Sequence, residues 1–385
     1  MTILTSTSEL DALCRDLSSH DYITIDTEFV REKTYFPKLC LIQLCAPGLD
    51  PVAIDPLSDQ LDLEPLRKLL SDPEIKKVFH AGRQDLEIFY HLFSELPHPV
   101  FDTQIAAMVC GYGDSAGYQK LVQDICNVTL DKAHQFTDWA YRPLSDNQLA
   151  YALDDVTYLR DIYEKLSTRL KEEGREKWLD EEMDILTNPQ TYEIIPEDCW
   201  QRLKLKNTKP PTLAAARALA AWREREAIKK DLPRPWILRD DTLVDLAQRR
   251  PKDIKDLKRI RNFPVKNEDS PLIRDVLRIL EDSRKVDKAN APDKPEKSKF
   301  DPDTAPTFEM LKMLLRITAA ENDVAGRIIA SQDDLKILSN KGEKADLKLL
   351  RGWRYEVFGK RALDLINGKV GIGLRNGRMA LTDLD

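Results

Sequence analysis

The 385-residue chain predicts an α/β domain over residues 1–200, followed by two small all-α helical bundles over residues 201–285 and 301–385. Three observations predict this organisation. Runs of β-branched and aromatic residues alternate with helical patterns in the first part. After residue 200, apolar residues recur at spacings of three to four. The two C-terminal stretches also repeat each other at an offset of 92 residues, without gaps over their middle.

The first strand is expected at Tyr22 to Val30, a run of β-branched and aromatic residues. Alternate side chains of a strand share a face, so Asp26 and Glu28 point together while Ile25 and Thr27 point the other way. Neighbouring carboxylates repel, and a like-charge pair about 4 Å apart costs roughly 4 kcal/mol at an effective dielectric of about 20. Divalent cations remove that cost, and hard carboxylate oxygens select Mg²⁺ or Mn²⁺.

Further elements follow in the first 110 residues. Strands are expected at Leu39 to Cys45, Val52 to Asp55 and Lys77 to His80, and helices at Leu61 to Leu70, Arg83 to Phe93 and Thr103 to Val109. Asp85 therefore lies near the start of a helix. Asp102 is expected to cap the helix that begins at Thr103 rather than to bind a metal.

A long helix is expected from Ser145 to Leu170, because the stretch has few helix breakers and apolar residues at helical spacing. Ser145 or Asp146 is its N-cap candidate. Tyr151 and Asp155 stand one turn apart on one face, which can place a metal ligand beside a hydroxyl that orients water. A phenol with an ordinary pKa of about 10 is a poor base at neutral pH, so a bound metal is expected to generate the hydroxide nucleophile.

Each of these short motifs alone also occurs by chance, because the chain contains 66 acidic residues. A surface carboxylate is the ordinary explanation for any one of them. For Asp26 that explanation is poorer, since an acid within an apolar strand is costly to bury without a partner. The occurrence of all three motifs in this order by chance is far less expected than the occurrence of any one of them.

The order Asp-x-Glu, His-Ala-x-x-x-Asp and Tyr-x-x-x-Asp resembles the DEDD exonuclease superfamily in its tyrosine-bearing subgroup. More closely, the sequence is similar to the bacterial ribonuclease D family. The segments that carry this similarity are Asp26 to Phe29, Leu41 to Leu44, Val78 to Asp85, Phe101 to Gln104, Asp138-Trp139, Arg142 to Leu144 and Tyr151 to Asp155. The similarity covers residues 1–200 and, through the helical units, nearly the whole chain.

The resemblance implies a ribonuclease H-like sheet flanked by helices, with two divalent metal ions held by Asp26, Glu28, Asp85 and Asp155. It also implies that Tyr151 helps to position the attacking water. One metal would be bridged by Asp26 and Asp155, and the other would be held through Asp26 with Glu28 and Asp85 nearby. All five positions are filled, which argues against an inactive copy.

The expected activity is hydrolysis of RNA from its 3′ end to nucleoside 5′-monophosphates. By resemblance, the substrates would be tRNA precursors and other small structured RNAs with 3′ trailers. Two alternatives stay open. A 3′-to-5′ DNA exonuclease shares the same acids, and a non-catalytic RNA-binding scaffold would use the helical units alone.

Five further positions are candidates for substrate binding: Thr27, Phe29, His80, Trp139 and Arg142. Phe29, with Tyr35 and Phe36, is a candidate to stack on terminal bases, and core packing is the alternative. For His80 the alternative is a packed or hydrogen-bonded residue. For Trp139 and Arg142 the alternative is packing under the long helix, and the sequence does not distinguish this from substrate binding.

The two helical units resemble HRDC domains, a nucleic-acid-binding module found in some helicases and in ribonuclease D. The repeat pairs Leu232 with Val324, Ile237 with Ile329, Leu243 with Leu335, Leu246 with Leu338 and Leu257 with Leu349. Between the units, residues 286–300 are polar and contain prolines, which predicts a linker.

Charge is divided unevenly along the chain. Residues 1–200 carry 18 basic and 37 acidic residues, a net charge of −19, whereas residues 201–385 carry 41 and 29, a net charge of +12. Binding of a polyanion therefore needs the metals and a separate basic surface. Residues 201–285 have a net charge of +10 against +1 for residues 301–385. The first helical unit is expected to hold most of the RNA phosphates, with a solvated charged face as the alternative.

Composition favours an enzyme of the cytoplasm, which we expect to be a monomer. No apolar stretch approaches the roughly 20 residues of a membrane span. The six cysteines contain no Cys-x-x-Cys pair and lie mostly in apolar runs, so buried reduced thiols are expected. The five histidines show no zinc-binding pattern.

Overall fold

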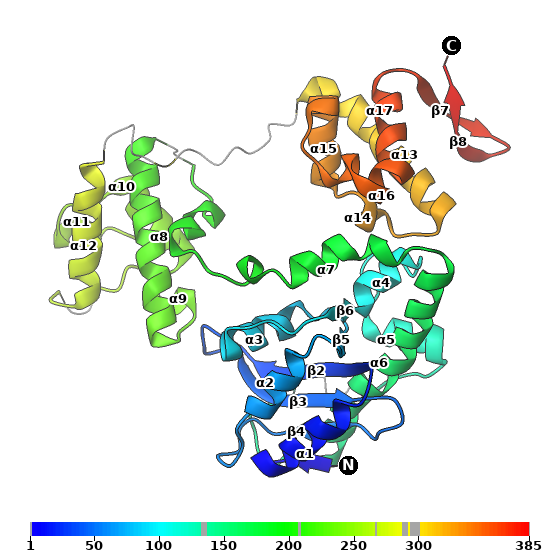
Figure 1. Ribbon diagram of the computed structural model, residues 1–385. Helices are drawn as coiled ribbons and strands as arrows, with labels where there is room; N and C mark the ends of the chain where they lie inside the picture. Colours follow the sequence, from blue (N-terminus) through cyan, green and yellow to red (C-terminus); the bar gives the residue numbers. More distant parts are fainter. Residues whose placement is uncertain are drawn as a thin grey trace. The chain divides into compact units, whose positions relative to one another are not determined.

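The computed structural model describes residues 2–131, 137–206, 209–265, 268–286, 292 and 301–384. The chain divides into two compact units (Figure 1). Unit 1 comprises Met1–Phe29, Leu39–Tyr192 and Ser298–Asp385, and unit 2 comprises Val30–Lys38 and Glu193–Lys297. Most of the linker expected at 286–300 lies outside the described residues.

Unit 1 is built around a mixed sheet with the strand order β1-β4-β3-β2-β5-β6 among its described residues. The strands are β1 (Thr2–Leu4), β2 (Tyr22–Val30), β3 (Lys38–Cys45), β4 (Val52–Ile54), β5 (Lys76–Phe79) and β6 (Val100–Asp102). β5 pairs in parallel with both β2 and β6, whereas β3 and β4 are antiparallel. The α/β prediction for the first domain is therefore confirmed.

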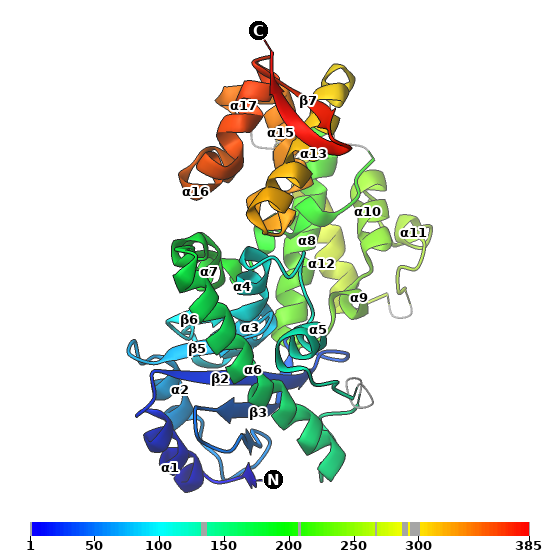
Figure 2. The ribbon, with the colours of Figure 1, turned by 90° about the vertical axis from the view of Figure 1, so that its right-hand side faces the viewer.

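Helices cover both faces of this sheet. They are α1 (Thr7–Leu17), α2 (Glu64–Leu70), α3 (Arg83–Phe93), α4 (Thr103–Val109), α5 (Tyr118–Leu121), α6 (Asp146–Glu172) and α7 (Asp180–Leu186). Ile23 and Ile25 of β2 are buried in a cluster with α1, α2 and α3. Tyr22 is buried in another cluster with α4 and α6, and α6 runs across this face of the sheet (Figure 2). The alternation along β2 thus directs its even-numbered residues toward α6.

Most expected elements are present, and three have the predicted bounds: β2, α3 and α4. Ser145 is the N-cap of α6 and forms a capping box with Gln148. α2 begins at Glu64 rather than Leu61, because Pro65 occupies its first turn. β5 ends at Phe79, one residue before the predicted end. β1, α1 and β6 were not expected.

The turn between β5 and α3 requires a glycine. A Cβ on Gly82 would lie 2.5 Å from the Cβ of Phe79, which is buried in the core. Asp102 fixes this turn, because its carboxylate accepts hydrogen bonds from the backbone N–H of Ala81 at 3.1 Å and of Gly82 at 2.9 Å. The same carboxylate accepts from the N–H of Gln104 at 2.8 Å and caps α4, as predicted.

The two helical regions share the same local structure over their middle parts. The first contains α8 (Pro210–Lys230), α9 (Arg234–Ile237), α10 (Asp240–Arg249), α11 (Ile254–Leu257) and α12 (Pro271–Arg284). The second contains α13 (Ala305–Asn322), α14 (Gly326–Ile329), α15 (Gln332–Lys341), α16 (Gly352–Arg354) and α17 (Lys360–Ile366). The bounds of α14 and α15 equal those of α9 and α10 shifted by the 92 residues read from the sequence. The left-handed residues that end α8 and α13, Asp231 and Asp323, obey the same shift.

The all-α prediction for residues 301–385 is wrong at its end. There β7 (Val370–Arg375) and β8 (Arg378–Asp383) form an antiparallel hairpin. Asn376 and Gly377 at its turn both have positive φ, 53° and 74°, as a type I′ turn requires. Apolar residues alternate before this Asn-Gly pair, which is the strongest short-range hairpin signal. The helical prediction extended the repeat past this signal.

Within unit 1, the second helical region packs against the α/β domain. The rings of Trp178 and Trp353 stack with centroids 4.2 Å apart and 5° between their planes. The buried guanidinium of Arg354 donates to Glu182 at 2.7 Å and also to Glu181, both on α7. These contacts explain why residues at the C-terminus belong to the same compact unit as the sheet.

Two expectations drawn from composition also have structural counterparts. All six cysteines are unpaired, and all except the half-buried Cys126 are buried. Over the described parts of the chain, no helix combines the length and the apolar character that crossing a bilayer requires.

Candidate active site

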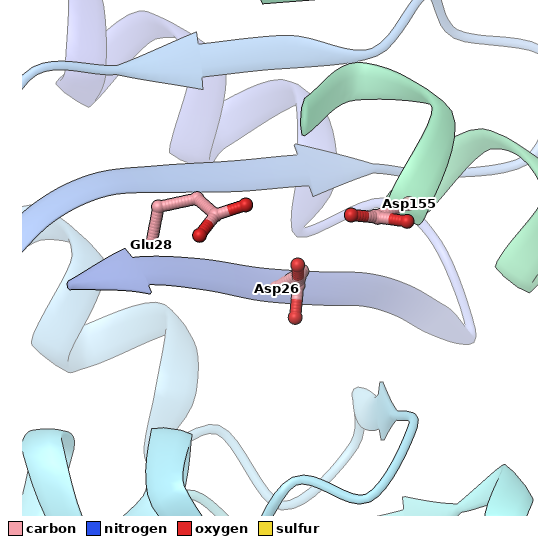
Figure 3. Close-up of side chains that lie close together, drawn as sticks. All are labelled: Asp26, Glu28 and Asp155. Atoms are coloured by element: carbon pink, nitrogen blue, oxygen red, sulfur yellow. The ribbon is translucent and has the colours of Figure 1, made fainter. Parts of the chain in front are cut away.

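Three carboxylates from two elements meet on the face of the sheet that α6 covers. Asp26 and Glu28 come from β2 and Asp155 from α6, and one oxygen of each lies within 4.8 Å of the others (Figure 3). The hydroxyl of Thr24 donates to the carbonyl of Val156 at 2.8 Å, which fixes β2 against α6 next to Asp155. Three hard oxygen donors at this separation match a divalent cation.

Asp85 approaches from the first turn of α3 and is not one of these three. Its buried carboxylate accepts a hydrogen bond from the hydroxyl of Thr27, which lies on the opposite face of β2 from Asp26. The negative charge of Asp85 is nevertheless close enough to raise the pKa of Asp26. Thr27, expected as a substrate-binding residue, therefore holds Asp85 in this structure.

Burial is the main cause of the raised pKa values in this cluster. The pKa of Asp26 rises well above its ordinary value, first through desolvation and then through repulsion by its acidic neighbours. Desolvation likewise raises the pKa of Glu28 to about 9, of Asp155 to about 7 and of Asp85 to about 6. Ionised, these groups destabilise one another unless a cation lies among them. The donor set thus fits the divalent metal ions that the sequence predicts.

A cleft of about 470 Å³ opens beside the carboxylates. Its walls include Asp26, Asp155, Tyr151, His80 and Tyr118. Acids, an imidazole and two phenols therefore face one cavity that is large enough to admit part of a nucleotide. The cleft brings together residues from β2, the turn after β5, α5 and α6.

Tyr151 stands one turn before Asp155 on α6, as predicted. Burial is the largest cause that raises its phenol pKa, and the charges of Asp155, Glu28 and Asp26 raise it further. The phenol therefore stays protonated at neutral pH and can donate a hydrogen bond. Trp139 is 3% exposed, and its ring centroid lies 6.2 Å from that of Tyr151. Trp139 thus packs beside Tyr151, which agrees with the packing alternative.

His80 lines the cleft, and its ring is held by a hydrogen bond with Thr103. Its Nδ1 is 3.0 Å from the hydroxyl of Thr103, which in turn donates to the carbonyl of Phe79 at 3.0 Å. Burial lowers the pKa of His80 to about 4, so its ring is neutral near pH 7. A neutral imidazole adds no charge beside the carboxylates.

Sequence reasoning missed the contribution of α5. Tyr118 and Lys120 line the cleft, and the phenol of Tyr118 donates to the carbonyl of Asp154 at 2.9 Å. This hydrogen bond joins α5 to α6 beside the catalytic candidates. No motif surrounds Tyr118, so only the tertiary fold reveals it.

The guanidinium of Arg142 forms hydrogen bonds with other groups of the protein. Its Nε and Nη2 donate to the carboxylate of Asp55 at 2.6 and 2.7 Å, and Nη2 also donates to the carbonyl of Cys40 at 2.6 Å. A third contact, from Nη1 to the carbonyl of Trp139 at 2.8 Å, holds the segment before α6. These bonds favour the packing alternative over substrate binding.

Tyr35 and Phe36 belong to unit 2, and Tyr35 is buried there with its hydroxyl bonded to Glu224. Burial excludes Tyr35 from stacking on bases. Phe36 is half-buried. Phe29 follows Glu28 on β2 and is half-buried, so its stacking on a terminal base stays a prediction.

Replacing Arg142 by Ala is expected to lower the free energy of unfolding by about 2 kcal/mol, since Asp55 and three backbone carbonyls lose charge-assisted hydrogen bonds. Urea unfolding followed by circular dichroism measures this loss. KM for RNA in the folded variant should stay near that of the parent protein. A variant of full stability with a strongly raised KM would instead restore the substrate-binding role.

Two protein families match parts of this sequence, and curated proteins match nearly all of it. The family described as 3′-5′ exonuclease matches residues 1–171, and the HRDC domain family matches residues 212–268. A ribonuclease D of Acidiphilium cryptum is 43% identical over 99% of this chain and 97% of its own length. A ribonuclease D of Bartonella henselae is 41% identical over 98% and 93%.

Among solved structures, that of Escherichia coli RNase D superposes with a TM-score of 0.80 at 30% identity, over 95% of this chain and 98% of the other. It is described as an exoribonuclease involved in structured RNA processing. The likeness supports a ribonuclease H-like exonuclease domain followed by a helical HRDC domain, and the HRDC match lies within the first helical region.

Proposed function

This chain belongs to the ribonuclease D family and is a 3′-to-5′ exoribonuclease, and we propose that Asp26, Glu28, Asp85, Tyr151 and Asp155 carry out its hydrolysis. The observation that carries this assignment is the convergence of Asp26, Glu28 and Asp155 within 4.8 Å at a cleft. Asp85 is held next to β2 by its hydrogen bond with Thr27, and Tyr151 lies one helical turn before Asp155 on α6.

The exonuclease family uses divalent metal ions, and we assign Mg²⁺ or Mn²⁺ because every candidate ligand is a hard carboxylate oxygen. When bound, two such ions supply the positive charge that offsets the cluster and stabilises the developing charge of phosphodiester hydrolysis. Asp26 has acidic neighbours on both sides and is the ligand that both ions would share. Asp155 would complete one site, and Glu28 with Asp85 the other.

The protein's own groups then orient the reactants. The protonated phenol of Tyr151 donates a hydrogen bond that positions the attacking water beside Asp155. Trp139 limits the movement of Tyr151 by packing against its ring. His80 and Phe29 are assigned to the terminal nucleotide, because His80 lines the cleft and Phe29 follows Glu28 on β2. The proposed products are nucleoside 5′-monophosphates.

The proposed substrates are tRNA precursors and other small structured RNAs with 3′ trailers. We assign phosphate holding to residues 201–285, which have the larger positive charge, and regard residues 301–385 as a second HRDC copy on the strength of the structural repeat. The domain bounds 1–200, 201–285, 286–300 and 301–385 are part of this proposal. So are a monomeric state and a place in the cytoplasm, where such precursors are processed.

Digestion of a 5′-labelled RNA with a 3′ extension tests the proposal on a denaturing gel, with Mg²⁺, Mn²⁺ or EDTA and with a DNA of the same sequence. We expect a ladder that shortens from the 3′ end, requires metal and is confined to RNA. Equal degradation of DNA would favour a general exonuclease. Binding without cleavage would favour the scaffold alternative.

Replacing Tyr151 by Phe is expected to reduce kcat about 10- to 100-fold, because the water loses one orienting hydrogen bond while every carboxylate remains. Single-turnover cleavage measures the rate, and titration calorimetry with Mn²⁺ measures metal affinity, which should be unchanged. A parallel loss of metal affinity would show that the phenol organises the carboxylates instead.

A further inference from the structure

Trp236 is an exposed aromatic residue on a rigid part of unit 2. It lies in α9, and its side chain is 60% exposed. Its backbone N–H donates to the carbonyl of Pro233 at 2.8 Å, and the next residue, Ile237, is buried in the core of the unit. The backbone of α9 is therefore fixed while the indole faces solvent. Trp has a large apolar ring with a polar N–H and is enriched at binding surfaces.

The surface around Trp236 of α9 is here called the corner of the helical fold. In the second helical region the internal repeat makes the corresponding corner, on α14, a contact surface. A shift of 92 residues places Ile328 at the position of Trp236, and Ile328 is only 4% exposed. Ile328 is buried in the cluster that includes α4, where the N–H of Ala325 donates to the carbonyl of Met108 at 2.8 Å. The second region thus covers this corner with the α/β domain, whereas the first region leaves it exposed among the described residues.

A groove of about 830 Å³ adjoins α9 in unit 2. Arg234, Pro235 and Arg239 line it on the side of the helical region, and Arg31 and Thr34 line it from the segment 30–38. The groove is thus formed by the residues on either side of Trp236 and by the loop that continues β2.

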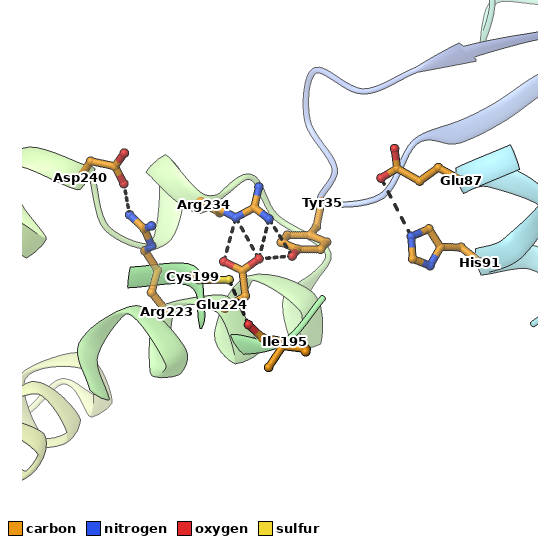
Figure 4. A network of polar contacts seen from close by, with 9 residues as sticks. All are labelled: Tyr35, Glu87, His91, Ile195, Cys199, Arg223, Glu224, Arg234 and Asp240. Atoms are coloured by element: carbon orange, nitrogen blue, oxygen red, sulfur yellow. Dashed lines mark hydrogen bonds and ion pairs between the residues drawn. The ribbon is translucent and has the colours of Figure 1, made fainter. Parts of the chain in front are cut away.

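Most charged side chains of this groove are paired with other described residues. Arg234 donates to the fully buried carboxylate of Glu224 at 2.7 Å (Figure 4). Asp240 is paired with the buried Arg223 at 2.5 Å. The carboxylate of Asp241, the other acid of the groove, accepts from the N–H of Thr242 at 2.8 Å.

Arg239 is exposed, and within the described residues its guanidinium makes no hydrogen bond or ion pair. An exposed indole three residues before an unpartnered guanidinium matches an unpaired nucleotide, whose base stacks on the ring while a phosphate binds the cation. The net charge of +10 over residues 201–285 favours a polyanion over an acidic or apolar patch of a protein.

We propose that Trp236 and Arg239 form a binding site for an unpaired nucleotide of the RNA, upstream of the 3′ end that is being cleaved. The base stacks on Trp236, and Arg239 contacts a neighbouring phosphate. The site rests on the proposed function, since it holds the strand whose end occupies the carboxylate cleft. It gives the first helical region a task that the second region, with this corner covered, does not share.

Binding of a fluorescent 12-nucleotide single-stranded RNA to the full-length protein in EDTA tests the site without cleavage. Replacing Trp236 by Ala should weaken binding about 10-fold, whereas Trp236→Phe, which keeps a stacking surface, should stay within about threefold of the parent. Arg239→Ala should reduce the slope of log affinity against log salt concentration by about one. Ile195→Ala, an equally exposed apolar residue of the same unit at 54%, is the control and should bind like the parent.

Cleavage kinetics separate this inference from the proposed function. With Mg²⁺, Trp236→Ala should raise KM for the 12-nucleotide RNA without changing kcat, and its activity on a dinucleotide should equal that of the parent. Parent-like RNA affinity in Trp236→Ala would overturn the site while leaving the exonuclease assignment intact. Equal losses in the Ala and Phe variants would overturn base stacking. A parent protein that binds RNA through Trp236 but cuts no RNA would refute the function and leave the binding site standing.

Discussion

Replacing Asp155 by Asn is expected to reduce RNA cleavage at least about 1000-fold while RNA affinity stays nearly unchanged. Asp155 is one of three carboxylates that lie within 4.8 Å, and its loss removes a ligand on which the transition state depends. RNA affinity is assigned mainly to residues 201–285, which the substitution does not touch. Single-turnover cleavage with Mg²⁺ and fluorescence anisotropy in EDTA measure the two quantities separately.

Asp154→Asn is the matched control for this substitution. Asp154 is the preceding residue of α6, carries the same side chain and is not one of the three clustered carboxylates. Its replacement should leave cleavage within a few-fold of the parent protein. A large loss of RNA affinity in Asp155→Asn would contradict the division between a catalytic cluster and a separate RNA-holding surface.

In the metal-free protein, the free energy of unfolding is expected to fall by at least about 2 kcal/mol between pH 5 and pH 9. The native pKa values of Asp85, Asp155 and Glu28 are raised to about 6, 7 and 9, whereas their values in the unfolded chain are near 4. As the pH rises above 4, the unfolded chain loses these protons first and binds fewer than the native state. Stability therefore decreases until each native pKa has been passed.

Thermal unfolding in EDTA over this pH range measures the decrease. Saturating Mn²⁺ should raise Tm most at the alkaline end, where the native carboxylates are ionised and the metal displaces no protons when it binds. Asp26→Asn removes the most strongly perturbed acid of the cluster and should flatten the profile in EDTA. A metal-free protein whose stability is constant or rises with pH would contradict the burial of these acids as a mutually repelling group.

The placement of the candidate catalytic residues was predictable where it depends on local periodicity. Asp26 and Glu28 share a face because a strand alternates, and Tyr151 and Asp155 share a face because they are one helical turn apart. Both relations hold in the structure. The same local rules located β2, α3 and α4, whose bounds depend on a cap or on a run of β-branched residues.

Other features depend on partners far away in the sequence. Arg142 is fixed by Asp55, 87 residues earlier, and no local pattern pairs them. For Tyr35 the sequence left base stacking and core packing open, and the choice depends on Glu224, 189 residues later, to which its buried hydroxyl is bonded. The C-terminal hairpin, in contrast, has a local signal in its Asn376-Gly377 turn. It was missed because the helical repeat was extended over these residues.

Anomalous scattering from crystals of this protein grown with Mn²⁺ locates the bound metal ions. We expect two peaks beside the carboxylate of Asp26, one reached by Asp155 and the other on the side of Glu28 and Asp85. The same crystals of Asp155→Asn should lose at least one peak. A single ion bound away from Asp26, or no ion at concentrations that support cleavage, would contradict a two-metal active site at this cluster.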